Sequence, residues 1–326
     1  MRIDIAKCER LAKLITEIQI PADQEELTLN LSVIPFSGRA DFLFSLVAIC
    51  HQTKALQGQV AGGHRKGWDY LSHALLAAFA NDHSLVSPTR LQKFSAVELW
   101  EIIRAPDSSA IITDIEGRAG LLNNLGEFLV TAGMESINEL HAQSGGFLHR
   151  VDSGGILQRL SLAKAYSDPV RKKSLYLCML AKNQGLWEFK DPEHLGPPVD
   201  YHEIRGHLRL GTIRIEDGSL LEQIRRGEVT EDTDIEIRAT IFNAIMEVSK
   251  RSGETPAALH YFFWNLFRSC CLPSMPHCAG CPDGCQLPAR YRLPKGSQRQ
   301  CSLESVCDSR SVKDRIVDYP LKTDFY

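Results

Sequence analysis

The chain has 326 residues, of which 44% are hydrophobic and 24% charged, and its formal net charge at pH 7 is −3. These fractions are typical of a globular protein with a hydrophobic core, and the length suits one large domain or two lobes. The slight acidic excess argues against a protein that coats polyanions with its whole surface, although it is compatible with a local basic patch.

The first predicted element, residues 4–18, is an amphipathic polar helix rather than a secretory signal. No later apolar run approaches the ~20 residues that a membrane-spanning helix needs. We therefore expect a cytoplasmic protein, monomeric and without a membrane partner.

Along most of the chain, apolar residues recur at intervals of three and four, which predicts helices. The predicted helices cover residues 4–18, 40–53, 66–81, 95–104, 115–132, 155–165, 170–183, 201–210, 217–226, 232–252 and 255–270. Only residues 27–34 alternate like a strand. The sequence therefore predicts an all-α protein.

Asp200 opens the predicted helix at 201–210, directly after two prolines that end the preceding element. A carboxylate at a helix start lies among N–H groups without intrahelical partners, which favour its negative charge. Asp200 is therefore a candidate for facing a positive charge that develops during a reaction. The alternative is a purely structural N-cap, with Glu203 completing a capping box.

Seven of the ten cysteines follow residue 269. Cys271, Cys278, Cys281 and Cys285 have the spacing C-x6-C-x2-C-x3-C on a segment rich in glycine and proline. Thiolates this close can enclose one metal ion or cluster, and clustered cysteines in an intracellular protein indicate a metal site more often than disulfides. Zinc is one alternative, with His277 as an alternative ligand.

A local basic excess overlaps this cysteine segment. Residues 268–300 carry five basic side chains and one acidic residue, Asp283, which gives a local charge of +4; the basic ones are Arg268, Arg290, Arg292, Lys295 and Arg299. We interpret Arg290 and Arg292 as candidate contacts to DNA phosphates, and a solvated surface is the alternative.

Several of these motifs together resemble the helix-hairpin-helix DNA glycosylases of base excision. Val199-Asp200-Tyr201-His202 is similar to the family's V-D-x-H segment, whose aspartate is catalytic. The four cysteines resemble the iron–sulfur loop C-x6-C-x2-C-x5-C of endonuclease III and the adenine glycosylases, with a last spacing two residues shorter. Residues 48–53 resemble the I-L-S-Q-Q-T helix that lines the family's base pocket.

The family's hairpin, L-P-G-V-G-x-K-T, holds a DNA phosphate through glycine N–H groups, whereas the matching segment here, residues 166–174, has no glycine. It resembles instead the hairpin of the archaeal 8-oxoguanine glycosylases. By that match Lys173 would be the Schiff-base lysine of a glycosylase with lyase activity, which requires a desolvated amine. Arg171, Lys172 and Arg205 are further candidates for DNA contact, and a solvated helix start is the alternative for the basic run.

A second resemblance covers more of the chain, namely residues 67–71, 98–132, 198–211 and 220–264. These segments are similar to the queuosine-salvage nucleotide glycosylases, all-helical proteins with an aspartate at the position of Asp200. Those proteins hydrolyse a 7-deazaguanine nucleotide rather than DNA. Their aromatic pocket segment appears here as residues 49–54 without an aromatic side chain, and the cysteine loop is not part of their pattern.

Both resemblances imply cleavage of an N-glycosidic bond, with Asp200 as electrostatic stabiliser and general base. Trp68, His51 and Gln52 are the candidates for stacking on the base and binding its edge. We expect a two-lobed helix-hairpin-helix glycosylase-like fold, with a central domain at 40–199 and a second domain, 1–39 plus 200–326, carrying a 4Fe-4S-type loop.

The favoured substrate is DNA with a modified base, including a bulky one, in repair or in defence against modified invading DNA. One alternative is a queuosine-type nucleotide glycosylase. The other is a non-catalytic nucleic-acid-binding module stapled by zinc.

Overall fold

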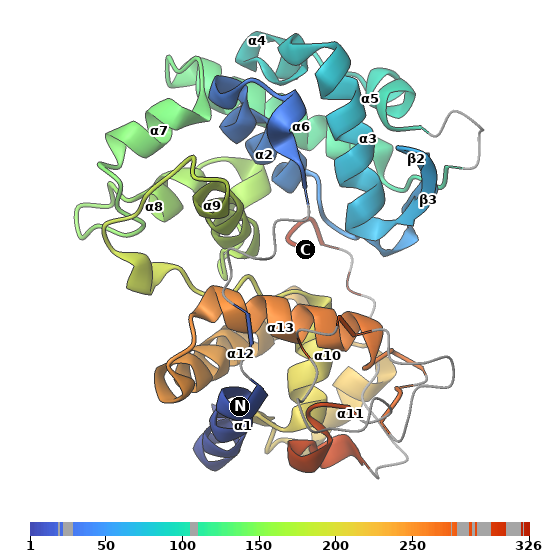
Figure 1. Cartoon of the computed structure of the whole chain (residues 1–326), viewed down its shortest axis with the longest axis vertical. Coiled ribbons are helices and arrows are strands. Elements are labelled where there is room, and N and C mark those ends of the chain that lie inside the picture. Colours follow the sequence, from blue (N-terminus) through green and yellow to red (C-terminus); the bar gives the residue numbers. More distant parts are fainter. Residues whose placement is uncertain are drawn as a thin grey trace. The chain divides into compact units, whose positions relative to one another are not determined.

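The computed structural model describes residues 1–18, 20–21, 29–104, 110–274, 276–278, 287–288, 291, 301–310, 321 and 323–326 (Figure 1). Helices dominate these residues, and their strands form only two antiparallel sheets of two strands each. The predicted all-α class is thus confirmed at the level of a mostly helical protein.

The chain divides into two compact units. Unit 1 comprises Met1–Glu26 and Gly196–Lys322, and unit 2 comprises Leu27–Leu195 and Thr323–Tyr326. This division places residues 27–39 in unit 2, whereas the predicted boundary lies at residue 39. The turn before residue 39 packs on the helix that begins at Arg39. Arg39 Nε, for example, donates to the carbonyl of Ile34 at 3.0 Å.

In unit 1, α1 packs along α12, and α10 packs against both α12 and α13. The periodic residues Ile237, Ile241 and Ile245 of α12 are fully buried, as their spacing predicted. Gly206 allows α10 and α13 to approach closely, because a Cβ there would lie 2.2 Å from the ring of Phe267. The elements are β1 (Arg2–Ile3), α1 (Ile5–Ile18), α10 (Tyr201–Leu210), β4 (Ile213–Arg214), α11 (Gly218–Arg226), α12 (Glu231–Ser252), α13 (Pro256–Ser269), η9 (Glu304–Val306) and η10 (Asp308–Arg310).

In unit 2, the apolar helix α2 is buried along almost its whole length and contacts α3, α6, α7 and α9. A helix that is hydrophobic all round belongs inside a fold, and α2 forms the centre of this one. The helices are η2 (Leu31–Val33), η3 (Phe36–Gly38), α2 (Arg39–Ala48), η4 (Thr53–Ala55), α3 (Gly67–Asn81), η5 (His83–Val86), α4 (Pro88–Leu91), α5 (Ala96–Ile103), α6 (Ile115–Thr131), α7 (Ile137–Gln143), α8 (Ile156–Leu160), η6 (Lys164–Tyr166), α9 (Lys172–Asn183) and η7 (Pro192–His194); the strands are β2 (Gln57–Val60) and β3 (Gly63–Lys66).

The strand expected at 27–34 was wrong where the structure describes it, because Leu31–Val33 forms a 3-10 helix capped by the side chain of Asn30. The hairpin of unit 2 lies instead at β2 and β3, whose mostly polar side chains give little alternation. The helix expected at 40–53 ends at Ala48, and the left-handed backbone of Gln52 (φ 44°) follows it. Helices α4 and α7 were not predicted.

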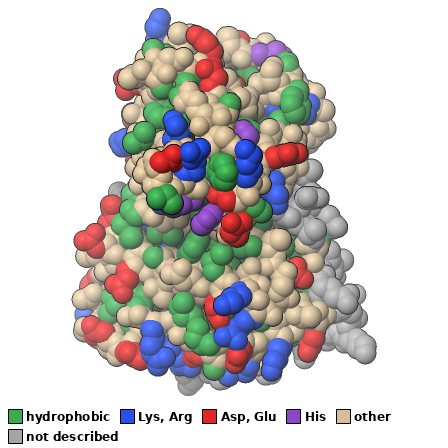
Figure 2. Space-filling model, turned by 90° about the vertical axis from the view of Figure 1, so that its left-hand side faces the viewer, with side chains coloured by type: hydrophobic (Ala, Val, Ile, Leu, Met, Phe, Trp, Pro, Cys, Tyr) green, Lys and Arg blue, Asp and Glu red, His purple; other side chains and the backbone are tan. Residues whose placement is uncertain are grey.

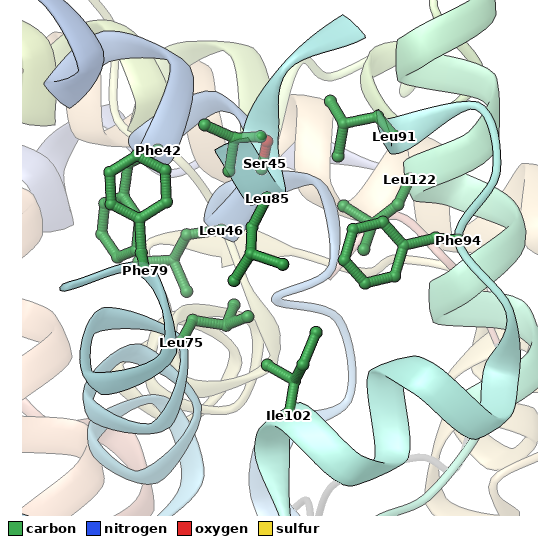
Figure 3. A pocket seen from close by; sticks show the side chains of 11 residues that line it. Phe42, Ser45, Leu46, Leu75, Phe79, Leu85, Leu91, Phe94, Ile102 and Leu122 are labelled. Carbon is green, nitrogen blue, oxygen red and sulfur yellow. The ribbon is translucent and has the colours of Figure 1, made fainter. Parts of the chain in front are cut away.

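An apolar cavity lies among the core helices of unit 2 (Figure 3). Side chains from α2, α3, α5 and α6 point into it, among them Phe42, Phe79 and Leu122. The one polar side chain of this lining belongs to Ser45 of α2. No group in the described part of the chain binds its hydroxyl. The lining offers no set of polar groups for catalysis, so we assign this cavity to the core.

Replacing Ser45 by alanine should raise the free energy of unfolding by about 1 kcal/mol, because a buried hydroxyl without a partner costs free energy on folding. Urea unfolding of both proteins measures this difference. Ser144 provides the matched control, since it is also buried but its hydroxyl donates to the carbonyl of His141 at 2.7 Å. Ser144→Ala should therefore be destabilising, and the same sign for both variants would contradict the assignment.

Candidate functional site

Asp200 lies at the N-cap of α10, and the predicted capping box is confirmed. Its Oδ1 accepts hydrogen bonds from the backbone N–H groups of His202 at 2.8 Å and Glu203 at 3.3 Å. In return, Glu203 Oε2 accepts the backbone N–H of Asp200 at 3.2 Å. No donor among the described residues binds the second carboxylate oxygen, Oδ2, so this is the atom of Asp200 that a ligand can use.

Glu203 connects the start of α10 to α13. Its side chain is fully buried, and Oε1 lies 2.9 Å from Nδ1 of His260. The same carboxylate thus binds Asp200 with one oxygen and His260 with the other. These two contacts hold the backbone at the start of α10, and the two N–H groups that bind Oδ1 orient the carboxylate of Asp200.

The three predicted base-binding residues all lie in unit 2, and two of them, His51 and Gln52, form side-chain hydrogen bonds within the protein. His51 is 1% exposed, and its Nε2 lies 2.9 Å from Oδ2 of Asp114. Gln52 donates through its side-chain amide to the carbonyl of Thr323, and through its backbone N–H to that of Tyr326, both at 3.0 Å. The last residues of the chain therefore pack against the segment that follows α2.

Trp68 lies in the first turn of α3 and is half-buried. Its ring meets Tyr176 of α9 edge to face, with ring centroids 5.2 Å apart. Tyr176 in turn lies under the ammonium group of Lys172, 5.3 Å from the ring centroid. These two contacts connect Trp68 on α3 to the basic run at the start of α9.

The basic run at the start of α9 is directed into the protein. Lys173 is fully buried, and its Nζ donates to the carbonyl of Ala48 at 2.5 Å. Lys172 is 8% exposed, and its Nζ donates to Sγ of Cys50 at 3.4 Å. The solvated helix start, the alternative for this basic run, is therefore wrong for both lysines. Lys172, predicted as a DNA contact, binds Cys50 in the structure. Arg171, which caps α9 with a left-handed backbone, stays half-exposed.

Burial lowers the pKa of Lys173 to about 7, and the neighbouring charge of Lys172 acts in the same direction. Burial also lowers the pKa of Arg118 to about 10. Arg118 is fully buried at the start of α6 and donates to the carbonyls of Ile49 and His51. Burial is the main reason that the pKa of His51 is lowered to about 2, and the neighbouring charges of Lys173, Arg118 and Lys172 lower it further. The imidazole of His51 is therefore neutral.

His51, Asp114 and Asp324 form a group whose possible ligand atoms all lie within 4.8 Å of one another. Two carboxylates and a neutral imidazole suit a divalent cation in ligand type. Here, however, the charges of Lys173, Arg118 and Lys172 also act on His51, and like charges disfavour a further cation. We therefore assign the group to an ionic network around the buried His51 rather than to a metal centre.

Sequence reasoning missed most members of this network. Asp114, Arg118, Tyr176 and Asp324 are separated from His51 by tens to hundreds of residues. Asp114 and Arg118 lie within the segment 98–132 that resembles the nucleotide glycosylases, but no pattern there marks either residue. Only the basic run beside Lys173 gave a signal, and it was interpreted as a surface feature.

In unit 1, a second cavity is lined by five cysteines, which are Cys270, Cys271, Cys278, Cys301 and Cys307. None of these five forms a disulfide. Of the predicted ligands, Cys271 and Cys278 line the cavity, whereas Cys281 and Cys285 lie outside the described residues, as do Arg290 and Arg292. His277, the alternative ligand, is half-buried and does not line the cavity.

Two buried arginines of α10 hold the cysteine segment. Arg205 Nε donates to the carbonyl of Cys271 at 2.8 Å, and another guanidinium nitrogen donates to that of Phe267. Arg209 donates to Sγ of Cys271 at 3.2 Å and to the carbonyl of Leu272 at 2.8 Å. Arg205, predicted as a DNA contact, is only 1% exposed, and its guanidinium binds these backbone carbonyls in the structure.

On the face shown in Figure 2, acidic and basic side chains of the described residues are intermixed. This agrees with the small net charge of the whole chain. None of the described helices is long and apolar enough to cross a membrane.

The chain matches no protein-family model and no curated protein. The resemblance to glycosylases therefore depends on the sequence motifs alone.

The stability of the protein should reflect the burial of Lys173. The pKa of a lysine in an unfolded chain is ~10.4. Between pH 7 and that pKa, the unfolded state therefore binds a proton at Lys173 that the folded state lacks. The free energy of unfolding then rises with pH, relative to Lys173→Met. Urea unfolding of both proteins at pH 7, 8 and 9 measures this difference, and a difference independent of pH would contradict the lowered pKa.

Proposed function

We propose that this protein is an N-glycosylase of the helix-hairpin-helix type that releases a modified base from DNA. The observation that carries the proposal is the geometry of Asp200, whose Oδ1 is held by two backbone N–H groups while Oδ2 is available. The V-D-x-H motif and the mostly helical fold agree with it. Repair, or defence against modified invading DNA, would both use such an activity.

Cleavage of an N-glycosidic bond develops positive charge on the sugar, and a fixed carboxylate stabilises that charge without reorganising. Asp200 supplies such a group, because its cap bonds and the contact of Glu203 with His260 fix its position. The available Oδ2 can also accept a proton from the attacking water. Trp68, His51 and Gln52 remain the predicted contacts of the base.

DNA is preferred over a free nucleotide because cysteines and basic residues occupy the same segment, which a nucleotide hydrolase does not need. Arg268 is the described member of this basic group, and it is exposed, with its guanidinium 4.2 Å from the ring centroid of Trp264. A 4Fe-4S cluster is the cofactor that we propose for the cysteine-lined cavity, with zinc as the alternative. When bound, it would link separate segments of unit 1.

Asp200→Asn should lower the rate of base release by at least about a hundredfold, because an amide cannot offset a developing positive charge. The fold should persist, since asparagine also caps helices well. Asp217 is the matched control, because it caps α11 through the N–H groups of Ser219 and Leu220 without any proposed catalytic role.

The assay is release of free base from a panel of DNAs with modified bases, with queuosine monophosphate as a separate substrate. Activity on the nucleotide alone would replace the DNA proposal by the queuosine-type alternative. Equal activity of Asp200→Asn and Asp217→Asn would leave Asp200 as a cap and remove the main support for catalysis. No release from any substrate would favour the nucleic-acid-binding module.

Lys173 is the candidate for an additional lyase step, and its lowered pKa supports this by making the neutral amine available near pH 7. Attack on the sugar would require its Nζ to leave the carbonyl of Ala48. Borohydride reduction during turnover traps an amine–sugar adduct, and Lys173→Met should abolish such a product. Normal base release without a trapped adduct would assign Lys173 to structure and leave a purely hydrolytic enzyme.

A further inference from the structure

We propose that Cys301 and Cys307, together with Cys271 and Cys278, ligate an iron–sulfur cluster in the cysteine-lined cavity of unit 1. This assignment refines the cofactor of the proposed function but does not depend on the reaction. It differs from the sequence-based ligand set, in which Cys281 and Cys285 take the last two positions.

Cysteines from separate segments converge on one cavity of unit 1. The cavity lies among α10, the end of α13 and the segment that carries Cys301 and Cys307. Cys271, Cys278, Cys301 and Cys307 all line it, so their thiols border the same space. Cys270, the C-cap residue of α13, is the fifth thiol of the lining, and we do not count it among the four ligands.

The spacing of the thiols distinguishes a cluster from a single zinc ion. A zinc ion binds its four sulfurs at ~2.3 Å, which places neighbouring sulfurs only about 3.8 Å apart. Among the described residues, the group of His51, Asp114 and Asp324 is the only set of three or more metal-binding side chains within 4.8 Å. The thiols around the cavity are thus spaced more widely than a single zinc site requires. A cluster, in which iron and sulfide lie between the thiolates, needs such a wider cage.

The charge around the cavity also suits thiolate ligands. Four thiolates bring negative charge into a half-buried site, and a buried cation offsets part of it. Arg209 is 1% exposed, lines the cavity and donates to Sγ of Cys271 at 3.2 Å. Hydrogen bonds to ligating sulfur also stabilise iron–sulfur clusters. Arg209 therefore orients Cys271 and supplies positive charge at the same time.

The segment of the two additional ligands is anchored within unit 1. Leu303 is 1% exposed, and Lys7 of α1 donates to the carbonyl of Val306 at 2.7 Å. Cys307 Sγ lies 3.4 Å from the carbonyl of Arg209, and the hydrogen bond that its S–H donates there would be lost when the thiolate binds iron. The contacts of Leu303 and Val306 hold this segment at the cavity without a metal.

The test compares paired variants of the full-length chain after anaerobic purification. The wild-type protein should contain about four irons and a matching amount of sulfide, with broad visible absorption. Cys301→Ser/Cys307→Ser should lose at least about nine-tenths of this iron, whereas Cys281→Ser/Cys285→Ser should retain it. Cys270→Ser is the control within the same cavity, and it should also retain the iron.

The reverse pattern, with iron lost only from the Cys281/Cys285 variant, would overturn the ligand assignment. One stoichiometric zinc and no iron in the wild-type protein would overturn the cluster. Because a variant can lose iron by failing to fold, the wild-type protein provides a second measurement. Its thiols are alkylated before and after iron removal and located by peptide mapping.

Cys271, Cys278, Cys301 and Cys307 should become reactive only after iron removal. Alkylation of Cys301 and Cys307 while the iron is retained would also overturn the proposal. Neither measurement uses base release, so failure of the glycosylase proposal and failure of the cluster proposal are distinguished.

Discussion

Helix α2 ends inside unit 2, and the buried carbonyl groups at its end need donors that the helix itself cannot supply. Lys173 donates to the carbonyl of Ala48, and Arg118 donates to those of Ile49 and His51. A carbonyl buried without a partner costs about 1–3 kcal/mol, so removing either cation would expose this deficit. Positive charge at the C-terminal end of a helix also interacts favourably with the helix dipole. The polar network of unit 2 is arranged around this constraint.

Unit 1 meets the same requirement with arginine at the end of α13. Arg205 binds the carbonyl of Phe267, and Arg205 and Arg209 both bind that of Cys271. Here the two guanidinium groups hold the chain where the cysteines converge, so the structural device also positions the thiols. A buried arginine is expensive to desolvate, and its several donors are satisfied together by backbone acceptors.

The use of basic side chains inside the protein changes the interpretation of its charge. Lys172, Lys173 and Arg205 resemble DNA contacts when considered as charges in a sequence, but the structure uses them for carbonyl groups, a thiol and an aromatic ring. Asp200 is different, because the local contacts that fix its Oδ1 leave its Oδ2 available. The proposed base release accordingly depends on a carboxylate held by a helix start.

Helix periodicity and capping are local, and the sequence alone determined them well: α10 spans 201–210 as predicted, with Asp200 as its cap. The mostly helical class follows from the same 3.6-residue pattern. Tertiary structure alone brought Cys301 to the cavity of Cys271, and Arg118 to the carbonyl of His51. Local patterns carry no information about such encounters, because which distant segments meet depends on how helices pack. The direction of a charged side chain depends on the same packing, since a buried acceptor attracts a lysine that the sequence would place in solvent.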